Sequence, residues 1–199
     1  MDVEKEKMEH ERRFSGAIDR LRSPRRMELL QVSRVVDECI TGIEAEVKSV
    51  LDVGTGNGVF AEAFAARGLQ VTGIDANAEM ILAAQRFVAA GQFRQAPAEA
   101  IPFPDASFDL VFLGHVLHET DDAVKALQEA RRVARTRVMI LEWPYRDEEG
   151  GPPLAHRLKP EQVAALAQQA GWQDIETIAL THMVLYRLPI HAQARETAI

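Results

Sequence analysis

A glycine-rich turn between a predicted strand and a predicted helix constrains the fold of this chain more than any other feature. The β-rich run 49–53 leads into Asp52-Val53-Gly54-Thr55-Gly56-Asn57-Gly58, and helical spacing of apolar residues follows over 57–67. The glycines allow a tight turn and let a ligand lie against bare backbone. A second strand over 70–74 is followed by Asp75, where a carboxylate can accept hydrogen bonds from ribose hydroxyls. This order predicts a Rossmann-like sheet that binds an adenosine-containing cofactor.

The rest of the chain continues the alternation of strands and helices. Further strands are expected over 93–95, 108–113, 138–143, 175–180 and 183–188, and further helices over 77–90, 121–134 with Asp121 as N-cap, and 160–170. Such alternation implies a parallel sheet with helices on both faces. Only Thr181 and His182 join the last two strands, and only an antiparallel pair closes so tightly. We therefore expect an α/β fold with a seven-stranded, mostly parallel sheet and one reversed strand.

The first 45 residues lack a strand signal and are predicted to form an N-terminal helical arm or lid on a domain that covers residues 46–199. Two short helices are expected there, and one begins with Ser23 as N-cap and Pro24 at the first helical position. The apolar positions between 27 and 40 are spaced as on one helical face. Phe14, Ile18 and Leu21 are spaced so that they should cover the cofactor pocket or the substrate entrance.

Composition excludes several classes of function. The chain has 23 Lys and Arg residues and 30 Asp and Glu residues. The resulting net charge of −7 argues against a general nucleic-acid-binding surface. The single cysteine, Cys39, cannot form an internal disulfide or a cysteine-rich zinc site, and no histidine or carboxylate cluster has metal-ligand spacing. No apolar run approaches the length of a membrane span, and the first residues lack a secretory signal. We expect a cytoplasmic monomer or homodimer without a metal.

The residues around the glycine turn discriminate between cofactors. A dinucleotide-binding turn needs a third glycine at position 59, where this chain has Val59. A P-loop needs a Gly-Lys-Ser/Thr sequence, and no lysine occurs between Lys48 and Lys125. Asp52, just before the glycines, is a poor neighbour for phosphate and suits a cationic ligand.

Three ordered motifs resemble the class I S-adenosylmethionine-dependent methyltransferases. They are D-V-G-T-G-N-G with the later G-I-D, A-E-A-I-P-F-P-D-A-S-F-D over 98–109, and G-H-V-L-H-E over 114–119. The second motif is similar to that of the small-molecule, type 11 branch, which includes the quinone-biosynthesis C-methyltransferases. The resemblance covers residues 47–190. It implies methyl transfer from S-adenosyl-L-methionine to a small-molecule acceptor by in-line displacement, with S-adenosyl-L-homocysteine as the product.

The resemblance also implies roles for individual residues. Asp52 would help to hold the cofactor's ammonium group, and Asp75 would bind the ribose diol. The implied cofactor-binding residues are Asp52, Gly54, Thr55, Gly56, Asn57, Gly58, Asp75, Ala76, Met80, Pro97, Ala98, Glu99, Gly114 and His115. Pro97 departs from the family, which often has an acidic residue there to accept the adenine amino group. A second departure is the turn before the fifth strand, which is shortened here to residues 134–137.

Candidates for catalysis follow the fourth and fifth strands. His118 and Glu119 lie at the mouth of the expected site, where His118 is a candidate general base or packs under the next helix. Glu142 ends the fifth strand and either orients an acceptor or caps a loop. His156 and Arg157 either meet an anionic substrate or form a surface pair.

Two other functions stay open on the sequence alone. An NAD(P)-dependent oxidoreductase would use the same sheet, but Val59 and the segment 98–103 weigh against it. A protein that binds S-adenosyl-L-methionine without catalysis would also fit, because Pro97 departs from the pattern and no base is certain.

Overall fold

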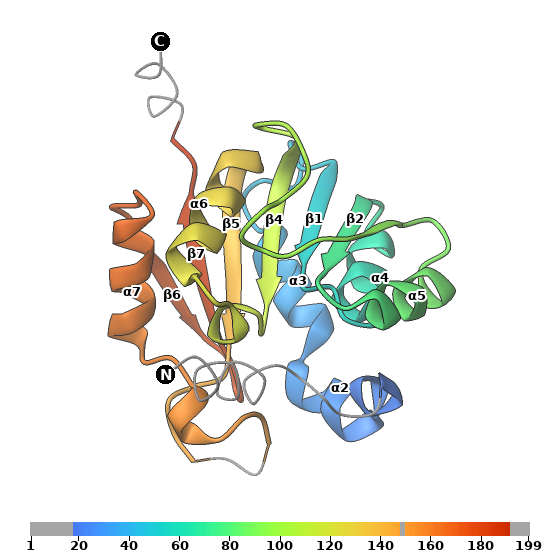
Figure 1. Ribbon diagram of the computed structural model, residues 1–199, viewed down its shortest axis with the longest axis horizontal. Coiled ribbons are helices and arrows are strands. Elements are labelled where there is room, and N and C mark those ends of the chain that lie inside the picture. Colours follow the sequence, from blue (N-terminus) through green and yellow to red (C-terminus); the bar gives the residue numbers. More distant parts are fainter. Residues whose placement is uncertain (1–17, 148–149, 192–199) are drawn as a thin grey trace, which may run out of the picture.

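The computed structural model describes residues 18–147 and 150–191, so Phe14 lies outside the described residues. One sheet of seven strands, in the order β3-β2-β1-β4-β5-β7-β6, forms its centre (Figure 1). The strands are β1 (Ser49–Val53), β2 (Gln70–Asp75), β3 (Gln92–Gln95), β4 (Phe108–Gly114), β5 (Ala134–Glu142), β6 (Glu176–Ala179) and β7 (Val184–Pro189). Strand β7 is antiparallel to β5 and β6, and all other pairs are parallel. The predicted α/β sheet with one reversed strand is confirmed.

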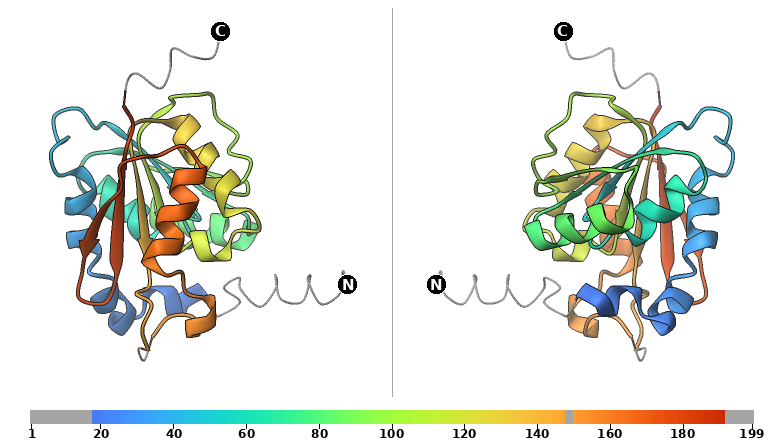
Figure 2. Two further views of the ribbon diagram at one scale, coloured as in Figure 1. Left: turned by 90° about the vertical axis from the view of Figure 1, so that its left-hand side faces the viewer. Right: turned by 90° about the vertical axis from the view of Figure 1, so that its right-hand side faces the viewer.

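Helices cover both faces of this sheet. The α-helices are α2 (Pro24–Leu30), α3 (Val32–Ile40), α4 (Val59–Ala65), α5 (Ala78–Phe87), α6 (Ala123–Val133) and α7 (Pro160–Gln169), and the 3₁₀ helices are η1 (Ile18–Arg22), η2 (Leu117–Glu119) and η3 (Leu154–His156). Helices α6 and α7 pack on one face, and α3 and α4 pack on the other (Figure 2). Within the described ranges, each helix is too short or too polar to span a bilayer.

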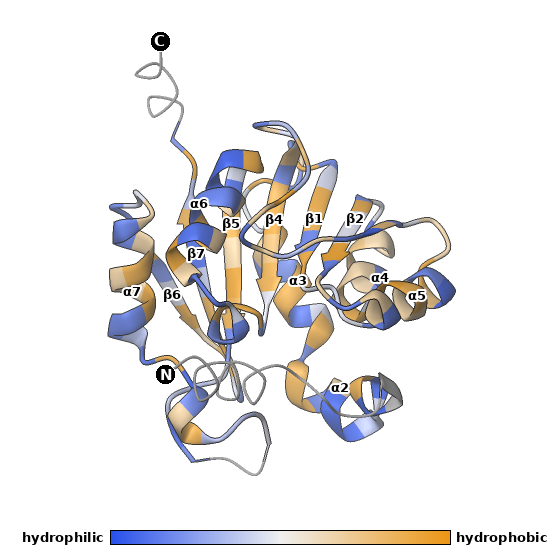
Figure 3. Cartoon of the chain, in the orientation of Figure 1, coloured by the Kyte–Doolittle hydropathy of each residue, from blue (hydrophilic) through white to orange (hydrophobic). Residues whose placement is uncertain are grey.

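Alternating apolar residues of the central strands supply both layers of the core. In β1, Leu51 and Val53 belong to the cluster under α6 and α7, whereas Val50 belongs to the cluster under α3 and α4. A parallel sheet covered on both faces needs apolar side chains at nearly every position, because successive residues point to opposite faces. Figure 3 shows this pattern, with hydrophobic strands at the centre and hydrophilic residues on the outer sides of the helices.

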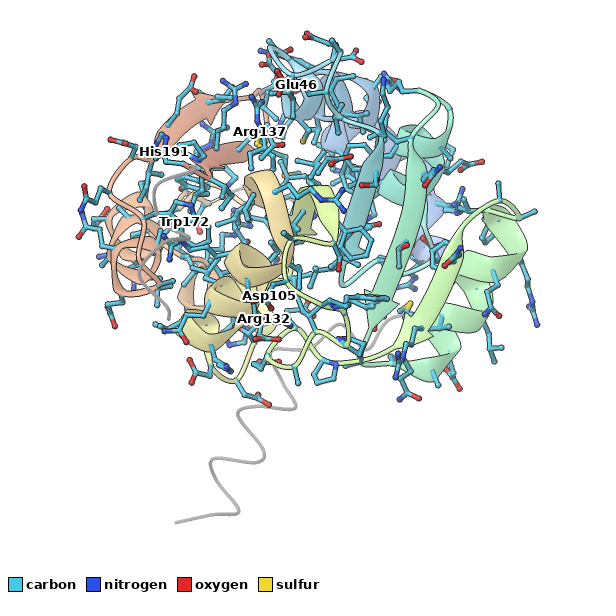
Figure 4. All side chains as sticks on the ribbon, turned by 90° about the horizontal axis from the view of Figure 1, so that it is seen from above. Glu46, Asp105, Arg132, Arg137, Trp172 and His191 are labelled. Atoms are coloured by element: carbon cyan, nitrogen blue, oxygen red, sulfur yellow. The ribbon has the colours of Figure 1, made fainter. Side chains whose placement is uncertain are left out.

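Arg132 of α6 fixes the segment 96–107, which joins β3 to β4. Its guanidinium donates hydrogen bonds to the backbone oxygens of Phe103 and Ile101 at 2.8 and 2.9 Å, and forms a 2.8 Å ion pair with Asp105 (Figure 4). Glu129, one turn earlier on α6, pairs with Arg132 and accepts a hydrogen bond from the amide of Ile101. Backbone groups of Ile101 and Phe103 and the carboxylate of Asp105 therefore hold this segment against α6.

The expectation of one continuous helical face from residue 27 to residue 40 is wrong. Gln31 has left-handed backbone angles, φ 47° and ψ 44°, and divides the segment into α2 and α3. The side chain of Gln31 accepts a hydrogen bond from the amide of Thr181 at 3.2 Å, a contact distant in sequence that supports the break. The predicted start of α2 is correct, because Ser23 caps its N-terminus and Pro24 is its first residue.

Two boundaries around α6 also differ from the prediction. Asp122, and not Asp121, is the N-cap, and its side chain accepts a hydrogen bond from the amide of Lys125 at 2.9 Å. The expected turn over 134–137 is absent, because β5 begins at Ala134 directly after α6. Arg135 in this extension forms an ion pair with Asp109 of β4 at 2.9 Å, which ties the two strands together.

Candidate functional site

One cavity of about 890 Å³ lies at the carboxyl ends of the parallel strands, the edge where Rossmann-like sheets bind ligands. Figure 1 shows η1, α2 and the segments 144–147 and 150–157 at this edge, beyond the arrowheads of the parallel strands. The residues that the resemblance assigned to cofactor binding line the cavity except Gly58, and so do the catalytic candidates His118 and Glu119, whereas Glu142 and Arg157 do not: the lining includes Asp52, Gly54, Thr55, Gly56, Asn57, Asp75, Ala76, Met80, Pro97, Ala98, Glu99, Gly114, His115, His118 and Glu119. The structure thus brings together segments that are far apart in the chain.

Close packing explains the glycines at both ends of the turn. Gly54 has φ +64°, and a Cβ atom there would lie 2.1 Å from Cγ2 of Val116. Gly58 has φ +80° and is the N-cap of α4, where a Cβ atom would lie 3.1 Å from Val88. A side chain would overlap Val116 at position 54 and crowd Val88 at position 58, and at both positions it would need an unfavourable backbone conformation. Gly58 therefore contributes by letting α4 approach α5 and not by lining the cavity.

Asp75 connects the end of β2 to the glycine turn. One carboxylate oxygen accepts a hydrogen bond from the amide of Gly56 at 2.9 Å, and the other accepts one from the amide of Asn77 at 2.8 Å. Burial raises the pKa of Asp75, and these two amides oppose that rise. Asp75 also lines the cavity, so these two amides fix a carboxylate at the border between the glycine turn and the cavity.

Asp52 is the buried carboxyl group of the site, with only 2% of its surface exposed. The hydroxyl of Thr55 donates a hydrogen bond to its Oδ2 atom at 2.7 Å. Burial raises the pKa of Asp52 to about 7, because the apolar surroundings disfavour the charged form more than Thr55 favours it. A cationic group beside Asp52 would stabilise the ionised form, so the carboxyl suits an ammonium ligand.

Glu99 joins the wall formed by residues 96–99 to the segment after η2. Its Oε1 atom accepts hydrogen bonds from the amides of Asp121 and Asp122 at 2.9 and 3.4 Å. Part of the hydrogen-bonding capacity of Glu99 is therefore used to hold two walls of the cavity together.

His118 and Glu142 form a buried pair at the ends of the neighbouring strands β4 and β5. Nδ1 of His118 lies 2.7 Å from Oε2 of Glu142, and the two side chains are only 3% and 2% exposed. The amide of His118 donates a second hydrogen bond to Oε1 of Glu142 at 3.2 Å. Nε2 of His118 lies 3.8 Å from Oε1 of Glu119. Burial alone lowers the pKa of His118, but the charge and hydrogen bond of Glu142, with help from Glu119, raise it above the usual value.

His115 occupies a different environment, although it is close in sequence. Its backbone has φ +60°, its ring lies on Trp143 with centroids 5.2 Å apart, and its Nε2 atom is 3.2 Å from Sδ of Met183. Burial lowers the pKa of His115 well below its usual value, and the charge of Arg26 acts in the same direction. The imidazole of His115 is therefore neutral near pH 7 and forms an aromatic part of the cavity wall.

The 3₁₀ helix η1 lies over the glycine turn. Leu21 lines the cavity, and a Cβ atom built on Gly56 would lie 3.7 Å from its Cδ1 atom. Arg22 forms a 2.6 Å ion pair with Glu62 of α4 and donates a hydrogen bond to the backbone oxygen of Asn57 at 3.1 Å. The guanidinium of Arg22 also stacks 3.9 Å above the ring of Phe87. These contacts attach η1 to the turn.

Arg157 organises the loop that follows β5 and does not line the cavity. Its guanidinium donates hydrogen bonds to the backbone oxygens of Pro144, Arg146, Gly150 and Pro152 at 3.2, 2.7, 2.6 and 2.9 Å. The suggestion that Arg157 meets an anionic substrate is therefore not supported, because these carbonyls occupy its donors. His156, the other residue of that suggestion, lines the cavity.

Arg26 and Leu30 of α2 also line the cavity, although the sequence did not assign either residue to the site. The sequence showed the start of α2 but carried no signal for where this short helix lies against the sheet. That position follows from contacts distant in sequence, such as the one between Gln31 and Thr181.

Comparisons with known proteins agree with this geometry. Residues 51–141 match a family described as a methyltransferase domain. The malonyl-[acyl-carrier protein] O-methyltransferase of Erwinia billingiae is 33% identical over 129 residues, which are 65% of this chain and 45% of that protein. The ubiquinone/menaquinone biosynthesis C-methyltransferase UbiE of Geotalea daltonii is 37% identical over 105 residues, 47% of this chain and 45% of that protein. The chain thus spans less than half the length of these two relatives.

A solved structure extends the similarity over nearly the whole fold. The crystal structure of a SAM-dependent methyltransferase from Aquifex aeolicus superposes with a TM-score of 0.75 and 25% sequence identity, covering 87% of this chain and 97% of that one. Residues 51–141 match a methyltransferase domain, and the chain is similar in sequence and fold to S-adenosylmethionine-dependent methyltransferases.

Proposed function

We propose that this protein transfers the methyl group of S-adenosyl-L-methionine to a small-molecule acceptor in the cavity at the strand ends. One observation carries the proposal: a single cavity is lined both by the glycine turn, with Asp52 and Asp75, and by His118, which is paired with the buried Glu142. The first group suits a cationic adenosine cofactor, and the second suits removal of a proton from an acceptor.

The residues of the glycine turn fit S-adenosyl-L-methionine in charge and shape. The carboxyl of Asp52 is desolvated and suits the cofactor's ammonium group, and Asp75 is oriented to accept hydrogen bonds from the ribose hydroxyls. The methionine part would lie along the backbone from Gly54 to Asn57. The proposed neighbours of the adenine are Ala76, Met80, Pro97, Ala98 and Glu99, and those of the sulfonium are Gly114 and His115.

The bound cofactor supplies an activated methyl group, and the chain supplies alignment and a base. Glu142 holds Nδ1–H of His118, so the lone pair of Nε2 is available to take a proton from an O–H, N–H or S–H acceptor as its new bond to carbon forms. The proton then leaves His118 for solvent. Glu119, 3.8 Å from Nε2, favours the protonated imidazole by its charge.

The N-terminal arm would act as a lid in this proposal. Leu21 and Arg22 contact the glycine turn from outside, so η1 would cover bound cofactor and slow its release.

A binding comparison followed by a turnover assay tests the proposed function. Isothermal titration of the purified protein should detect S-adenosyl-L-homocysteine and neither NADH nor NADPH. Labelled S-adenosyl-L-methionine should then transfer its methyl group to a member of pooled hydroxyl, amine and thiol acceptors. If NADH or NADPH binds and S-adenosyl-L-homocysteine does not, the protein would instead be an oxidoreductase. Cofactor binding without transfer to any pool would instead indicate a binding protein without catalysis.

A further inference from the structure

Arg26 is a cation that faces the cavity and forms no fixed pair with any described residue. Of the described residues that line the cavity, it alone is a lysine or arginine. Ser23 accepts a hydrogen bond from the amide of Arg26, and this N-cap fixes the backbone from which the side chain extends. Within residues 18–147 and 150–191, no side-chain hydrogen bond or salt bridge of the Arg26 guanidinium is present.

Three other partly buried or buried arginines of the chain each have fixed partners for the guanidinium, unlike Arg26. Arg22 is bound to Glu62 and Asn57, Arg132 to Glu129 and Asp105, and Arg157 to four backbone oxygens. Each of these arginines joins two segments of the fold. Arg26 joins none in the described part of the chain, although burial lowers its pKa and so marks the guanidinium as partly desolvated.

The charged and titratable neighbours of Arg26 lie in the segment after β4, where the proposed sulfonium site at His115 meets the proposed acceptor site at His118. Its charge acts on His115, and the charge of Glu119 acts on Arg26. Both neighbours belong to the segment after β4 that also carries His118. Glu119 is close enough to act through its charge but forms no salt bridge with Arg26, so the donors of the guanidinium stay available in this part of the chain.

We propose that Arg26 binds an anionic oxygen group, a carboxylate or a phosphate, on the methyl acceptor and makes this site specific for acidic small molecules. The inference rests on the proposed function, because it names the substrate class of the same site. A guanidinium offers paired donors that match both anions, and a charge-assisted pair in a partly closed cavity is stronger than one in water. An anion held by Arg26 would leave a separate nucleophile of the acceptor to approach His118.

Binding to the cofactor-product complex tests this assignment without the natural substrate. The probes are para-hydroxybenzoate with its neutral amide, hexanoate with hexanamide, and phenyl phosphate, each titrated into protein saturated with S-adenosyl-L-homocysteine. We expect at least one anionic probe to bind, and an acid that binds should do so about tenfold or more tightly than its amide, because the amide cannot form the charged hydrogen bond. Binding of phenyl phosphate alone would identify phosphate, and binding of the acids alone would identify carboxylate.

Two variants decide whether Arg26 is responsible. Arg26→Gln should abolish the preference for the anion and leave the dissociation constant of S-adenosyl-L-homocysteine unchanged. Arg34→Gln removes an exposed arginine from α3 that does not line the cavity, and it should keep the preference. Equal binding of acid and amide, an unchanged preference in Arg26→Gln, or binding of no anionic probe would overturn the inference. Failure of S-adenosyl-L-homocysteine to bind the wild type would instead count against the proposed function.

Discussion

His118 and Glu142 are joined by a 2.7 Å contact between Nδ1 and Oε2, across the ends of two neighbouring parallel strands. The pairing of β4 with β5 sets this contact, because Gly114 lies opposite Leu141 and each chain continues to the same edge of the sheet. The two residues therefore act as a pair: the carboxylate of Glu142 fixes the imidazole ring of His118, and this ring is the group that can exchange a proton.

Replacing His118 tests its role as a base. His118→Ala should lower turnover by about 100-fold or more while the affinity for S-adenosyl-L-homocysteine stays nearly unchanged. Steady-state kinetics and titration of the same preparation provide the two measurements. If His118→Ala loses thermal stability, and the fraction of the variant that is folded has full activity, His118 only supports packing.

The pH dependence of catalysis should depend on Glu142. The pKa of His118 is raised, so the neutral imidazole that acts as base appears only as the pH rises through that value. We therefore expect kcat/KM to increase with pH with a midpoint above the ordinary histidine value of about 6.5. In Glu142→Gln the charge is removed and burial dominates, so the midpoint should move to lower pH. Identical midpoints in the two proteins would remove Glu142 from this role.

Asp52 should make the affinity for the cofactor depend on pH. Its pKa is raised to about 7 in the free protein, and a bound ammonium group would lower it. Binding then releases a proton near neutral pH, so the affinity for S-adenosyl-L-homocysteine should rise by up to about tenfold between about pH 6 and 7.5. Calorimetry in buffers of different ionisation enthalpy detects the released proton. Asp52→Asn should bind more weakly and without this pH dependence.

The contacts of η1 predict a kinetic effect on cofactor release. The double variant Leu21→Ala, Arg22→Ala removes the side chain over Gly56 and the bonds to Glu62 and Asn57. Stopped-flow measurements should show faster dissociation of S-adenosyl-L-homocysteine, by about tenfold, because a charge-assisted hydrogen bond no longer holds η1 on the turn. Arg20→Ala, an exposed neighbour in the same element, is the matched control. Equal dissociation rates in all three proteins would contradict the lid.

Local patterns were sufficient to predict most of the fold. The order of strand, glycine turn, helix and strand depends on neighbouring residues, and the short connection at Thr181 and His182 requires an antiparallel pair. The break at Gln31 was not predicted, because the apolar spacing runs through it and the supporting contact comes from Thr181. Likewise, the start of β5 at Ala134 depends on pairing with β4, which a local pattern does not contain.

The candidate site was predicted better for the glycine turn than for the opposite wall. Asp75 follows from its position at the end of a strand, whereas the pairing of His118 with Glu142 requires the register of two strands. The place of Arg26 in the cavity depends on how α2 lies against the sheet, so spacing along the chain did not reveal it.

Asp75 provides the strongest test of the cofactor assignment. Its two oxygens are held by the amides of Gly56 and Asn77, which fix the carboxylate beside the glycine turn, where the proposed cofactor would place its ribose. Charge-assisted hydrogen bonds contribute roughly 1.5–3 kcal/mol, so Asp75→Ala should weaken S-adenosyl-L-homocysteine binding by about 10- to 150-fold. Asp75→Asn keeps the size of the side chain but not its charge and should give an intermediate loss. Circular dichroism checks that both variants are folded, since Asp75 ends a strand and adds little to the apolar core. A folded Asp75→Ala protein with the wild-type dissociation constant would remove this residue from the site and count against an adenosine cofactor at the turn.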